Sequence, residues 1–218
     1  MAAALKGLAP FEVVFVDDGS TDGTVAALLA ARDVLPELRV ISHDHRCGKS
    51  AALRTGIEAA RGEWIATIDG DGQDDPAEIV PMLALALEAG PARPGPLVVG
   101  VRVKRNDNLS RRAATRFANG LRRRLLNDGC PDTGAPMKLF RRDDFLRLPQ
   151  FEGVHRFLPA LFQHYGSALI CKPVHHRARL HGSSKYTNLN RALVGIRDMM
   201  GVMWLQSRTH ISARSSER

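Results

Sequence analysis

Short apolar runs alternate along the chain with longer amphipathic segments and polar turns. Four runs, bounded by Gly, Pro or Asp, have the length and branched side chains of buried strands: Phe11–Val16, Leu38–Ser42, Trp64–Ile68 and Leu97–Val101. Three intervening segments have helical periodicity: Val25–Leu35, Gly48–Ala60 and Pro76–Ala89. Strands that alternate with helices in this way predict an α/β layer, with a mixed, mostly parallel sheet flanked by helices.

The second half of the chain continues this pattern less regularly. Residues 108–127 form a very basic segment with helical character, and a last helix is expected over Leu189–Leu205. Between them the pattern predicts a strand, a helix and a second strand: Met137–Phe140, Arg156–Tyr165 and Ala168–Val174. The tail after Arg208 is expected to fray.

Composition places the chain among globular proteins. It has 218 residues, of which 44% are hydrophobic and 25% charged, and no apolar run reaches the roughly 18 residues of a membrane span. The three cysteines are far apart and form no CxxC pair, which argues against a disulfide framework or a cysteine zinc site and indicates a reducing compartment. Residues 1–90 carry a net charge of −8 and residues 91–218 carry +16, so the second half suits an anionic partner.

Two acidic clusters follow predicted strands at their carboxyl ends, where ligands bind in parallel α/β sheets. Asp69 and Asp71, one residue apart, can share a Mg²⁺ or Mn²⁺ ion, and Gln73 could add an oxygen. Acids that favour a helix N-terminus are the alternative. Asp17 and Asp18 could accept hydrogen bonds from a ribose or a base edge, or could simply form a turn with a helix cap.

The segment Gly48-Lys49-Ser50 follows a strand and opens a helix, as a phosphate-binding P-loop does. A P-loop also requires a glycine at the position that His43 occupies, so we reject that interpretation. The simpler expectation is a helix start with Lys49 facing polar groups.

Basic residues in the second half suit a phosphate. Arg112 and Arg116 share a helix face with Thr115 nearby, while Arg102 and the run Arg122-Arg123-Arg124 extend the set. Nucleic acid is the competing partner, but aromatic residues are only 6% of the chain and do not interleave with this run, so we expect no nucleic acid.

A second basic segment, from Arg179 to Lys185, could close over a diphosphate or could be an ordinary solvated loop. Nearby, His175, His176 and His181 match no common zinc spacing.

These motifs together resemble the family 2 inverting glycosyltransferases with a GT-A fold, which is a Rossmann-like fold of nucleotide-diphospho-sugar transferases. The nearest likeness is to polyprenol-phosphate mannosyltransferase-like enzymes. The matching segments occur in family order: 13–24, 47–76, 98–102, 108–126, 132–142, 155–166 and 179–186.

The resemblance implies a role for each motif. Asp17, Asp18, Asp69 and Asp71 would bind the nucleotide sugar, and Asp69, Asp71 and Gln73 would surround Mg²⁺ or Mn²⁺. Asp71 and Asp132 would be the catalytic carboxylates, with Asp132 near the sugar and acceptor. The acceptor phosphate and the closing loop would use the remaining set: Arg102, Arg112, Thr115, Arg179, Ser184 and Lys185.

The implied activity is metal-dependent, inverting transfer of a hexose from GDP-mannose or a UDP-hexose to a polyprenyl phosphate. The protein would lie on the membrane surface at the cytoplasmic face of the cell membrane. The implied organisation is a GT-A domain over 1–187, with a donor half over 1–101 and an acceptor half over 102–187. An amphipathic helix over 188–208 and a tail over 209–218 would follow.

One departure from the family concerns the amino end. The family opens with a strand bearing a P-x-x-N-E segment, and the ten residues before Phe11 contain none. We therefore expect a truncated chain, or a start placed too late, with an open sheet edge along Val13–Val16.

Three alternatives remain open from the sequence. The chain could be a glycosyltransferase with a non-lipid acceptor, a nucleotidyltransferase, or a catalytically impaired homologue that only binds its ligands. The last helix could lie at a membrane interface or pack on the domain.

Overall fold

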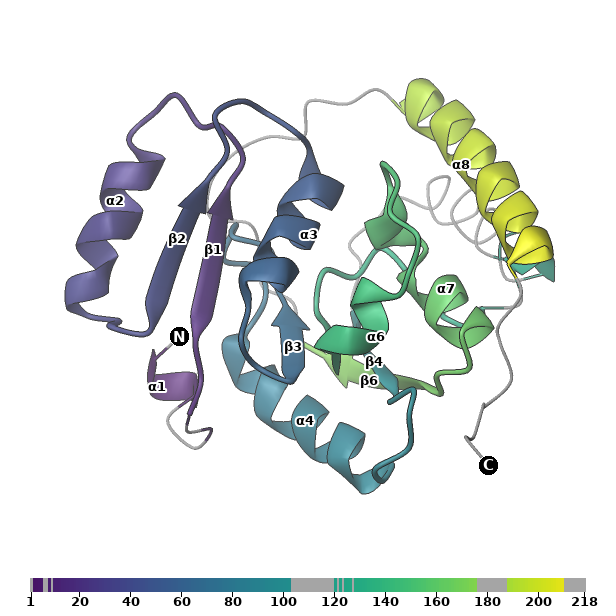
Figure 1. The fold of residues 1–218 in the computed structure, drawn as a ribbon, viewed down its shortest axis with the longest axis horizontal. Helices are drawn as coiled ribbons and strands as arrows, with labels where there is room; N and C mark the ends of the chain where they lie inside the picture. The colour runs from purple at the N-terminus through teal and green to yellow at the C-terminus, as the bar shows by residue number, and fades with distance from the viewer. Residues whose placement is uncertain are drawn as a thin grey trace, which may run out of the picture.

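The computed structural model describes residues 2–5, 8, 10–102, 120, 122, 124–126, 128–175 and 188–209 (Figure 1). Its strands are β1 (Val13–Asp17), β2 (Leu38–Ser42), β3 (Trp64–Thr67), β4 (Leu97–Arg102), β5 (Lys138–Arg141) and β6 (Leu169–Val174). Its helices are α1 (Ala2–Leu5), α2 (Thr24–Ala30), α3 (Lys49–Ala59), α4 (Ile79–Glu88), α6 (Arg142–Leu146), α7 (Leu158–His164) and α8 (Asn188–Arg208). Short 3-10 turns are η1 (Ala31–Asp33), η2 (Pro76–Glu78) and η3 (Val154–Arg156).

The described strands form two sheets. Strands β1 and β2 pair in parallel, and a four-stranded sheet has the order β3-β5-β4-β6. Strands β4 and β6 are parallel, whereas β5 runs antiparallel to both of its neighbours. The predicted mixed α/β arrangement with flanking helices is therefore confirmed, although parallel pairings do not predominate. Because β5 runs antiparallel to β4, the loop before β5 lies at the carboxyl end of β4, where Asp132 pairs with Arg102.

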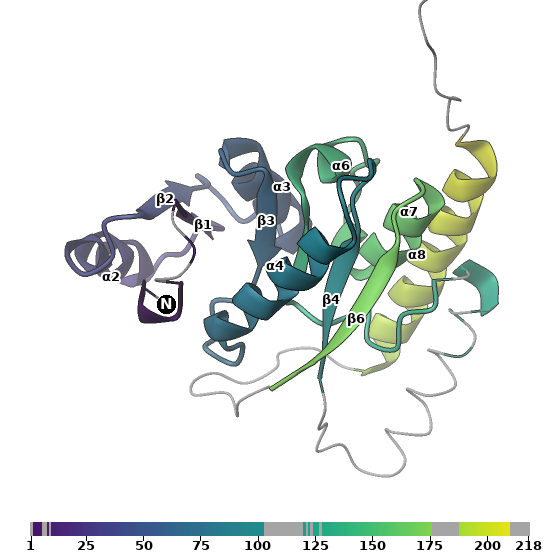
Figure 2. The ribbon, with the colours of Figure 1, turned by 90° about the horizontal axis from the view of Figure 1, so that it is seen from below.

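The four-stranded sheet buries apolar side chains on both faces, as Figure 2 shows for the helices that cover it. Leu97, Val99 and Phe140 face α6 and α7, in a core that α8 extends with Val202. Val98 and Leu139 face the opposite way, in a core that α4 supplies with Met82 and Ala86. Successive strand residues point to opposite faces, so two covered faces require the near-continuous apolar runs seen in the sequence.

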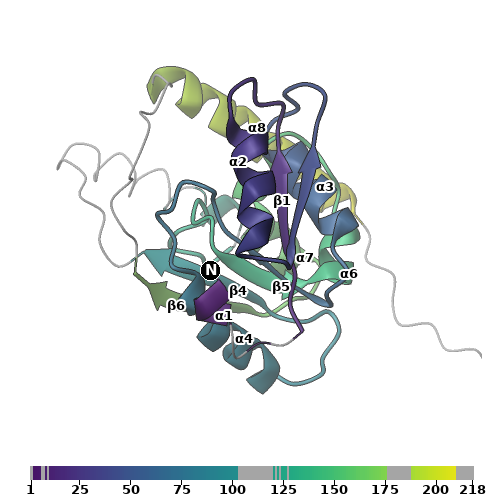
Figure 3. The ribbon, with the colours of Figure 1, turned by 90° about the vertical axis from the view of Figure 1, so that its left-hand side faces the viewer.

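An open main-chain edge separates the two sheets. Within the described chain, β1 pairs only with β2 and β3 pairs only with β5, so the expected open edge along Val13–Val16 is present (Figure 3). The side chains on this edge are nevertheless half-buried. Phe15 packs so closely on the loop after β3 that a Cβ at Gly70 would come within 3.1 Å of its ring. Val16 packs in the same way on Gly56 of α3.

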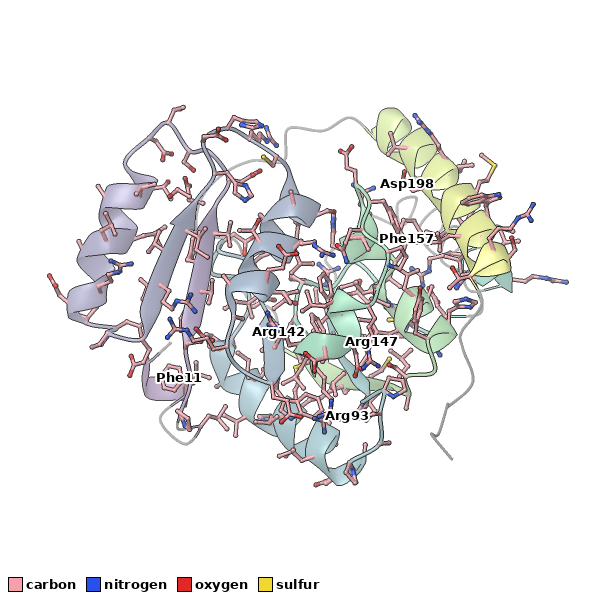
Figure 4. The ribbon with its side chains drawn as sticks, viewed as in Figure 1. Phe11, Arg93, Arg142, Arg147, Phe157 and Asp198 are labelled. Atoms are coloured by element: carbon pink, nitrogen blue, oxygen red, sulfur yellow. The ribbon has the colours of Figure 1, made fainter. Side chains whose placement is uncertain are left out.

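Helix α3 is fixed at its carboxyl end by a side chain from α6. The Arg142 guanidinium donates to the carbonyl oxygens of Ile57 at 3.0 Å and Glu58 at 2.8 Å (Figure 4). The last carbonyls of a helix have no partner within it, so this contact satisfies two of them. The amino end of α3, which faces the acidic clusters, is thereby held in place.

Helix α8 packs on the domain through one side. Val202 is buried, Gln206 donates to the Ala160 carbonyl oxygen at 3.2 Å, and Asp198 lies 3.6 Å from Arg156. Its exposed residues include a set of large apolar side chains: Val194, Ile196, Met200, Met203 and Trp204. Within the described residues, no helix has both the length and the apolar character that crossing a membrane requires.

Replacement of Phe162 tests the larger core. Its ring lies 5.2 Å from that of Phe140 between centroids and is 1% exposed, so Phe162→Ala removes a buried aromatic and leaves a cavity. We expect the free energy of unfolding to fall by about 3–5 kcal/mol in urea titrations. Leu87→Ala, on the exposed side of α4, should change the free energy of unfolding by less than about 0.5 kcal/mol. Equal losses in both variants would contradict the assignment of Phe162 to the buried core.

Candidate active site

Three consecutive residues at the start of α3 each hold a different part of the site. The Gly48 amide donates to Asp18 Oδ2 at 2.7 Å, and the Lys49 ammonium donates to Asp69 Oδ1 at 2.5 Å. Ser50 Oγ lies 2.9 Å from His155 Nδ1. The two predicted acidic clusters therefore lie on either side of one helix start, and the expectation that Lys49 faces polar groups is confirmed.

The first cluster lies where β1 and β2 end. Asp17 is 3% exposed and its Oδ2 accepts from the Ser20 amide at 3.1 Å, so this carboxylate holds its own turn. Asp18 Oδ1 lies 2.8 Å from His43 Nδ1 and accepts from the Cys47 amide at 2.9 Å. Burial raises the pKa of Asp18, but the hydrogen bonds from His43 and from backbone amides outweigh it and lower the pKa overall.

Gly19 is required for this turn to form. Its φ of +70° is in the left-handed region, and a Cβ there would lie 2.6 Å from the His45 backbone. The loops after β1 and β2 thus meet in close backbone contact beside Asp18.

The second cluster follows β3. Asp71 Oδ1 accepts from the Gln73 amide at 3.2 Å, and the nearly buried Asp74 accepts from the Asp69 amide at 3.3 Å. The helical turn η2 is capped by Asp75, which accepts from the Ala77 amide at 3.1 Å. Asp75 alone caps this helical turn among the described acids of the cluster. The alternative in which acidic residues stabilise a helix N-terminus therefore does not explain Asp69 and Asp71.

Arg102 and Asp132 form a two-pronged ion pair at the end of β4. Arg102 Nε and Nη2 donate to the two carboxylate oxygens at 2.7 and 2.9 Å, and both side chains are largely buried. This hydrogen bonding raises the pKa of Arg102 despite the opposing effect of burial, and Asp74 and Asp69 add to the rise. A Cβ on Gly134 would lie 3.9 Å from both Arg102 and Asp132, and Gly134 lines the same cavity as Asp69, so the pair lies near the second acidic cluster.

Arg122 supports the loop that carries Asp132. It is 9% exposed, donates to the Cys130 carbonyl oxygen at 2.6 Å, bonds Thr133 and lies 2.9 Å from Asp128. The sequence groups Arg122 with basic residues that suit a phosphate, whereas the structure shows it buried and paired with Asp128. The guanidinium is buried because Asp128, six residues later, provides a carboxylate inside the fold.

Two further polar residues at this site, Lys138 and His155, were not predicted. They line a cavity of about 60 Å³ together with Lys49 and Asp69. Lys138 lies opposite Thr67 in β3 and is 3% exposed, and its ammonium donates to the Ala135 carbonyl oxygen. A charged residue within the apolar run of β5 was the signal in the sequence.

Burial dominates the acid–base behaviour of both residues. It lowers the pKa of Lys138 to about 8, and the neighbouring Lys49 contributes in the same direction. It lowers the pKa of His155 to about 4, so this imidazole is neutral near pH 7. The site therefore contains a neutral imidazole and a weakened ammonium beside its carboxylates.

The structure leaves part of the predicted set undescribed. Arg112, Thr115, Arg179, Ser184 and Lys185 lie outside the described residues. A larger hollow of about 750 Å³, between α7 and the end of α8, has no predicted site residue in its described lining.

The carboxylates after β3 suit a divalent cation in their chemistry. Asp69 and Asp71 offer the hard oxygen ligands that Mg²⁺ and Mn²⁺ prefer. The Asp69 carboxylate already forms an ion pair with the Lys49 ammonium, so it faces a cationic group in this structure.

Comparison with known proteins identifies the family. The family described as Glycosyl transferase family 2 matches residues 2–148. The chain belongs to glycosyl transferase family 2. The resemblance inferred from the sequence motifs is thereby confirmed.

Curated relatives of this family 2 chain act on polyprenyl phosphates according to their names. A dodecaprenyl-phosphate galacturonate synthase from Rhizobium johnstonii is 36% identical over 199 residues, covering 89% of this chain and 57% of the relative. An undecaprenyl-phosphate 4-deoxy-4-formamido-L-arabinose transferase from Yersinia enterocolitica is 32% identical over 190 residues, covering 85% and 56%. The chain spans somewhat more than half the length of these relatives, and neither is named as a mannosyltransferase.

Solved structures confirm the GT-A-like fold of this family 2 chain. Glucosyl-3-phosphoglycerate synthase from Mycobacterium tuberculosis, in complex with Mn²⁺, UDP-glucose and phosphoglyceric acid, matches with a TM-score of 0.59 and 21% identity. The match covers 94% of this chain and 72% of that one. The same enzyme with Mg²⁺ and UDP gives a TM-score of 0.60 at 21% identity, over 93% and 72%.

The buried Lys138 predicts an unusual dependence of stability on pH. Below pH 8 the folded chain bears the full cost of a buried ammonium, roughly 3 kcal/mol from the lowered pKa. Between pH 8 and 10.5 only the unfolded chain keeps this proton, so this group makes the free energy of unfolding rise with pH.

Lys138→Met should therefore be more stable than the parent chain at pH 7, by up to roughly 3 kcal/mol, with a gain that shrinks above pH 8. Urea unfolding of both proteins at pH 7 and pH 10 measures this. A gain that is the same at both pH values would show that the charge is not responsible.

Proposed function

We propose that this chain transfers a sugar from a nucleotide-diphosphate sugar to the phosphate of a polyprenyl phosphate, with the aid of Mg²⁺ or Mn²⁺. The observation that carries the proposal is that Asp69 and the Arg102–Asp132 pair lie near each other at the carboxyl ends of β3 and β4, where the loop before β5 joins them. The polyprenyl-phosphate specificity in the names of its relatives supports the lipid acceptor. Residues 1–101 would form the donor half and residues 102–187 the acceptor half.

In the donor half, the carboxylates have separate tasks. Asp18 would accept hydrogen bonds from the nucleoside, in the turn that Asp17 holds in shape. Asp69, Asp71 and Gln73 would hold the cation. When bound, the cation would offset the negative charge that develops on the leaving diphosphate.

In the acceptor half, Arg102 would receive the lipid phosphate. Asp132 holds the guanidinium in one orientation, which favours directional hydrogen bonds to phosphate oxygens. The buried charge of Lys138 and the ammonium of Lys49 lower the cost of bringing a second anion to the site. Asp132, which pairs with Arg102, would lie near the sugar and acceptor.

The bond changes require little proton transfer. A phosphate monoester is largely ionised near pH 7, so its oxygen can attack the anomeric carbon without a strong general base. The new carbon–oxygen bond forms as the bond to the diphosphate breaks on the opposite face, which inverts the anomeric centre. Burial lowers the pKa of His155 to about 4, so it is a weak base, which is consistent with a reaction that needs no strong general base.

Transfer assays with the full chain test this proposal. A panel of GDP- and UDP-sugars, including UDP-linked galacturonate and 4-deoxy-4-formamido-L-arabinose, would be supplied with Mg²⁺ or Mn²⁺, with and without polyprenyl phosphate. We expect lipid-dependent release of nucleoside diphosphate, reduced on the order of 100-fold or more by Asp71→Asn. Asp33→Asn, an exposed acid on η1, is the matched control and should retain full activity.

Other outcomes would favour the alternatives. Turnover that does not require the lipid would indicate a different acceptor. Release of inorganic diphosphate from a nucleoside triphosphate would indicate nucleotidyl transfer. Donor binding without any turnover would indicate a binding protein.

We also propose that α8 places the active site beside the cytoplasmic face of a membrane. Its exposed residues include Met200 and Trp204, at 58% and 62% exposure, although the opposite side of the helix is packed. The net charge of +16 over residues 91–218 would favour an anionic lipid surface. A peripheral position would bring the site to the phosphate of a lipid acceptor.

Binding to vesicles tests the role of α8. The double variant Met200→Ser/Trp204→Ser should bind vesicles of phosphatidylglycerol and phosphatidylcholine at least about tenfold more weakly, because two apolar side chains no longer leave water. Leu29→Ser, an exposed apolar residue on α2, is the control in a co-sedimentation assay. Equal binding of the double variant and the parent chain would exclude α8 as the contact.

A further inference from the structure

Three chemically different metal ligands meet where β1 and β2 end. The ligand atoms of Asp18, His43 and Cys47 all lie within 4.8 Å of one another. Asp18 and His43 are partly buried, whereas Cys47 is exposed to solvent. A carboxylate, an imidazole and a thiol form a donor set for a borderline-soft ion such as Zn²⁺, and differ from the oxygen-only ligands after β3.

His45 lies beside Cys47, outside the group whose ligand atoms are within 4.8 Å of one another, and would turn toward that group to serve as a fourth ligand. Its Nε2 atom is 3.6 Å from Cys47 Sγ. A tetrahedral zinc ion with bonds of about 2.0 Å to nitrogen and 2.3 Å to sulfur separates these two ligands by about 3.6 Å. The two side chains therefore already have the spacing of ligands on one ion.

Neighbouring groups orient both imidazoles. Asp44 Oδ1 lies 2.5 Å from His45 Nδ1, an arrangement of carboxylate and histidine that is common around bound zinc. His43 Nε2 lies 2.9 Å from Thr55 Oγ1, which can accept a hydrogen bond from the Nε2–H group and so leave Nδ1 as the ligand atom. Metal binding would replace the present hydrogen bond between His43 Nδ1 and Asp18.

The carboxylate of Asp18 is held in place from behind. The Cys47 and Gly48 amides donate to its two oxygens at 2.9 and 2.7 Å. A fixed, ionised carboxylate contributes a ligand without a cost of ordering it on binding.

We propose that Asp18, His43, His45 and Cys47 bind one Zn²⁺ ion at a site separate from the Asp69–Asp71 carboxylates. The Cys47 thiol loses its proton to solvent on binding, as thiolate ligation requires. Sequence spacing had argued against a cysteine zinc site because no CxxC pair is present. The sequence does not reveal these ligands as a group, because Asp18 is brought beside residues 43–47 only by the pairing of β1 with β2.

A consequence follows for the donor, and it rests on the proposed function. Asp18 would serve both the nucleoside and the zinc ion, so the two would exclude each other. Zn²⁺ would then inhibit transfer by competing with the nucleotide sugar, while Mg²⁺ or Mn²⁺ at the other carboxylates supports it.

Direct binding of the metal tests the site without any assay of transfer. The chelator-treated full chain would be titrated with Zn²⁺ against a chromophoric chelator, and separately with Co²⁺ as a spectroscopic substitute. We expect one ion per chain and a near-ultraviolet charge-transfer band of thiolate-bound Co²⁺. Cys47→Ser should abolish that band and weaken Zn²⁺ binding on the order of 100-fold or more, whereas Cys171→Ser, at an exposed cysteine on β6, should match the parent chain.

Second variants separate the two proposals. Asp71→Asn should bind Zn²⁺ as the parent chain does, and His45→Gln should weaken binding with the fold intact by circular dichroism. Equal Zn²⁺ affinity of Cys47→Ser and the parent chain, or no stoichiometric binding, would overturn the zinc site. Failure of UDP and GDP to bind the zinc-free chain would count against the proposed function and leave the zinc site standing.

Discussion

The antiparallel position of β5 between β3 and β4 is the constraint on which the site depends. A strand that runs backwards begins where its neighbours end, so the loop before β5 lies beside Asp69 and Arg102. Lys138, at the first position of β5, is placed opposite Thr67 in the same way. The buried ammonium, its carbonyl partner and the Arg102–Asp132 pair all follow from that one strand direction.

Much of the fold was predictable because the early elements depend on local pattern. The strand at Leu38–Ser42 and the helix over Lys49–Ala59 lie within a residue of their predicted bounds. The direction of β5 was not predictable, since pairing is decided by distant residues. The split of the strands into two sheets depends on pairing as well, although the absent family motif indicated the open edge.

The site was predicted in its carboxylates but not in the contacts that organise them. Asp17, Asp18, Asp69 and Asp71 follow strands, and a strand end is a local signal. The cations that face them come from separate elements, as Lys49 does, or from inside a strand, as Lys138 does. Arg122 was misjudged because a run of arginines is typical of a surface, while the buried Asp128 draws this one inward.

The open edge of β1 has a consequence for the colloidal behaviour of the chain. Amides and carbonyls along a strand edge form a template on which another polypeptide can add as a strand. Among the described residues, the side chains of Phe15 and Val16 pack beside this edge, in close contact with Gly70 and Gly56. This strip of backbone is therefore a place where a second chain could add as a strand at high concentration, without unfolding of the two apolar cores.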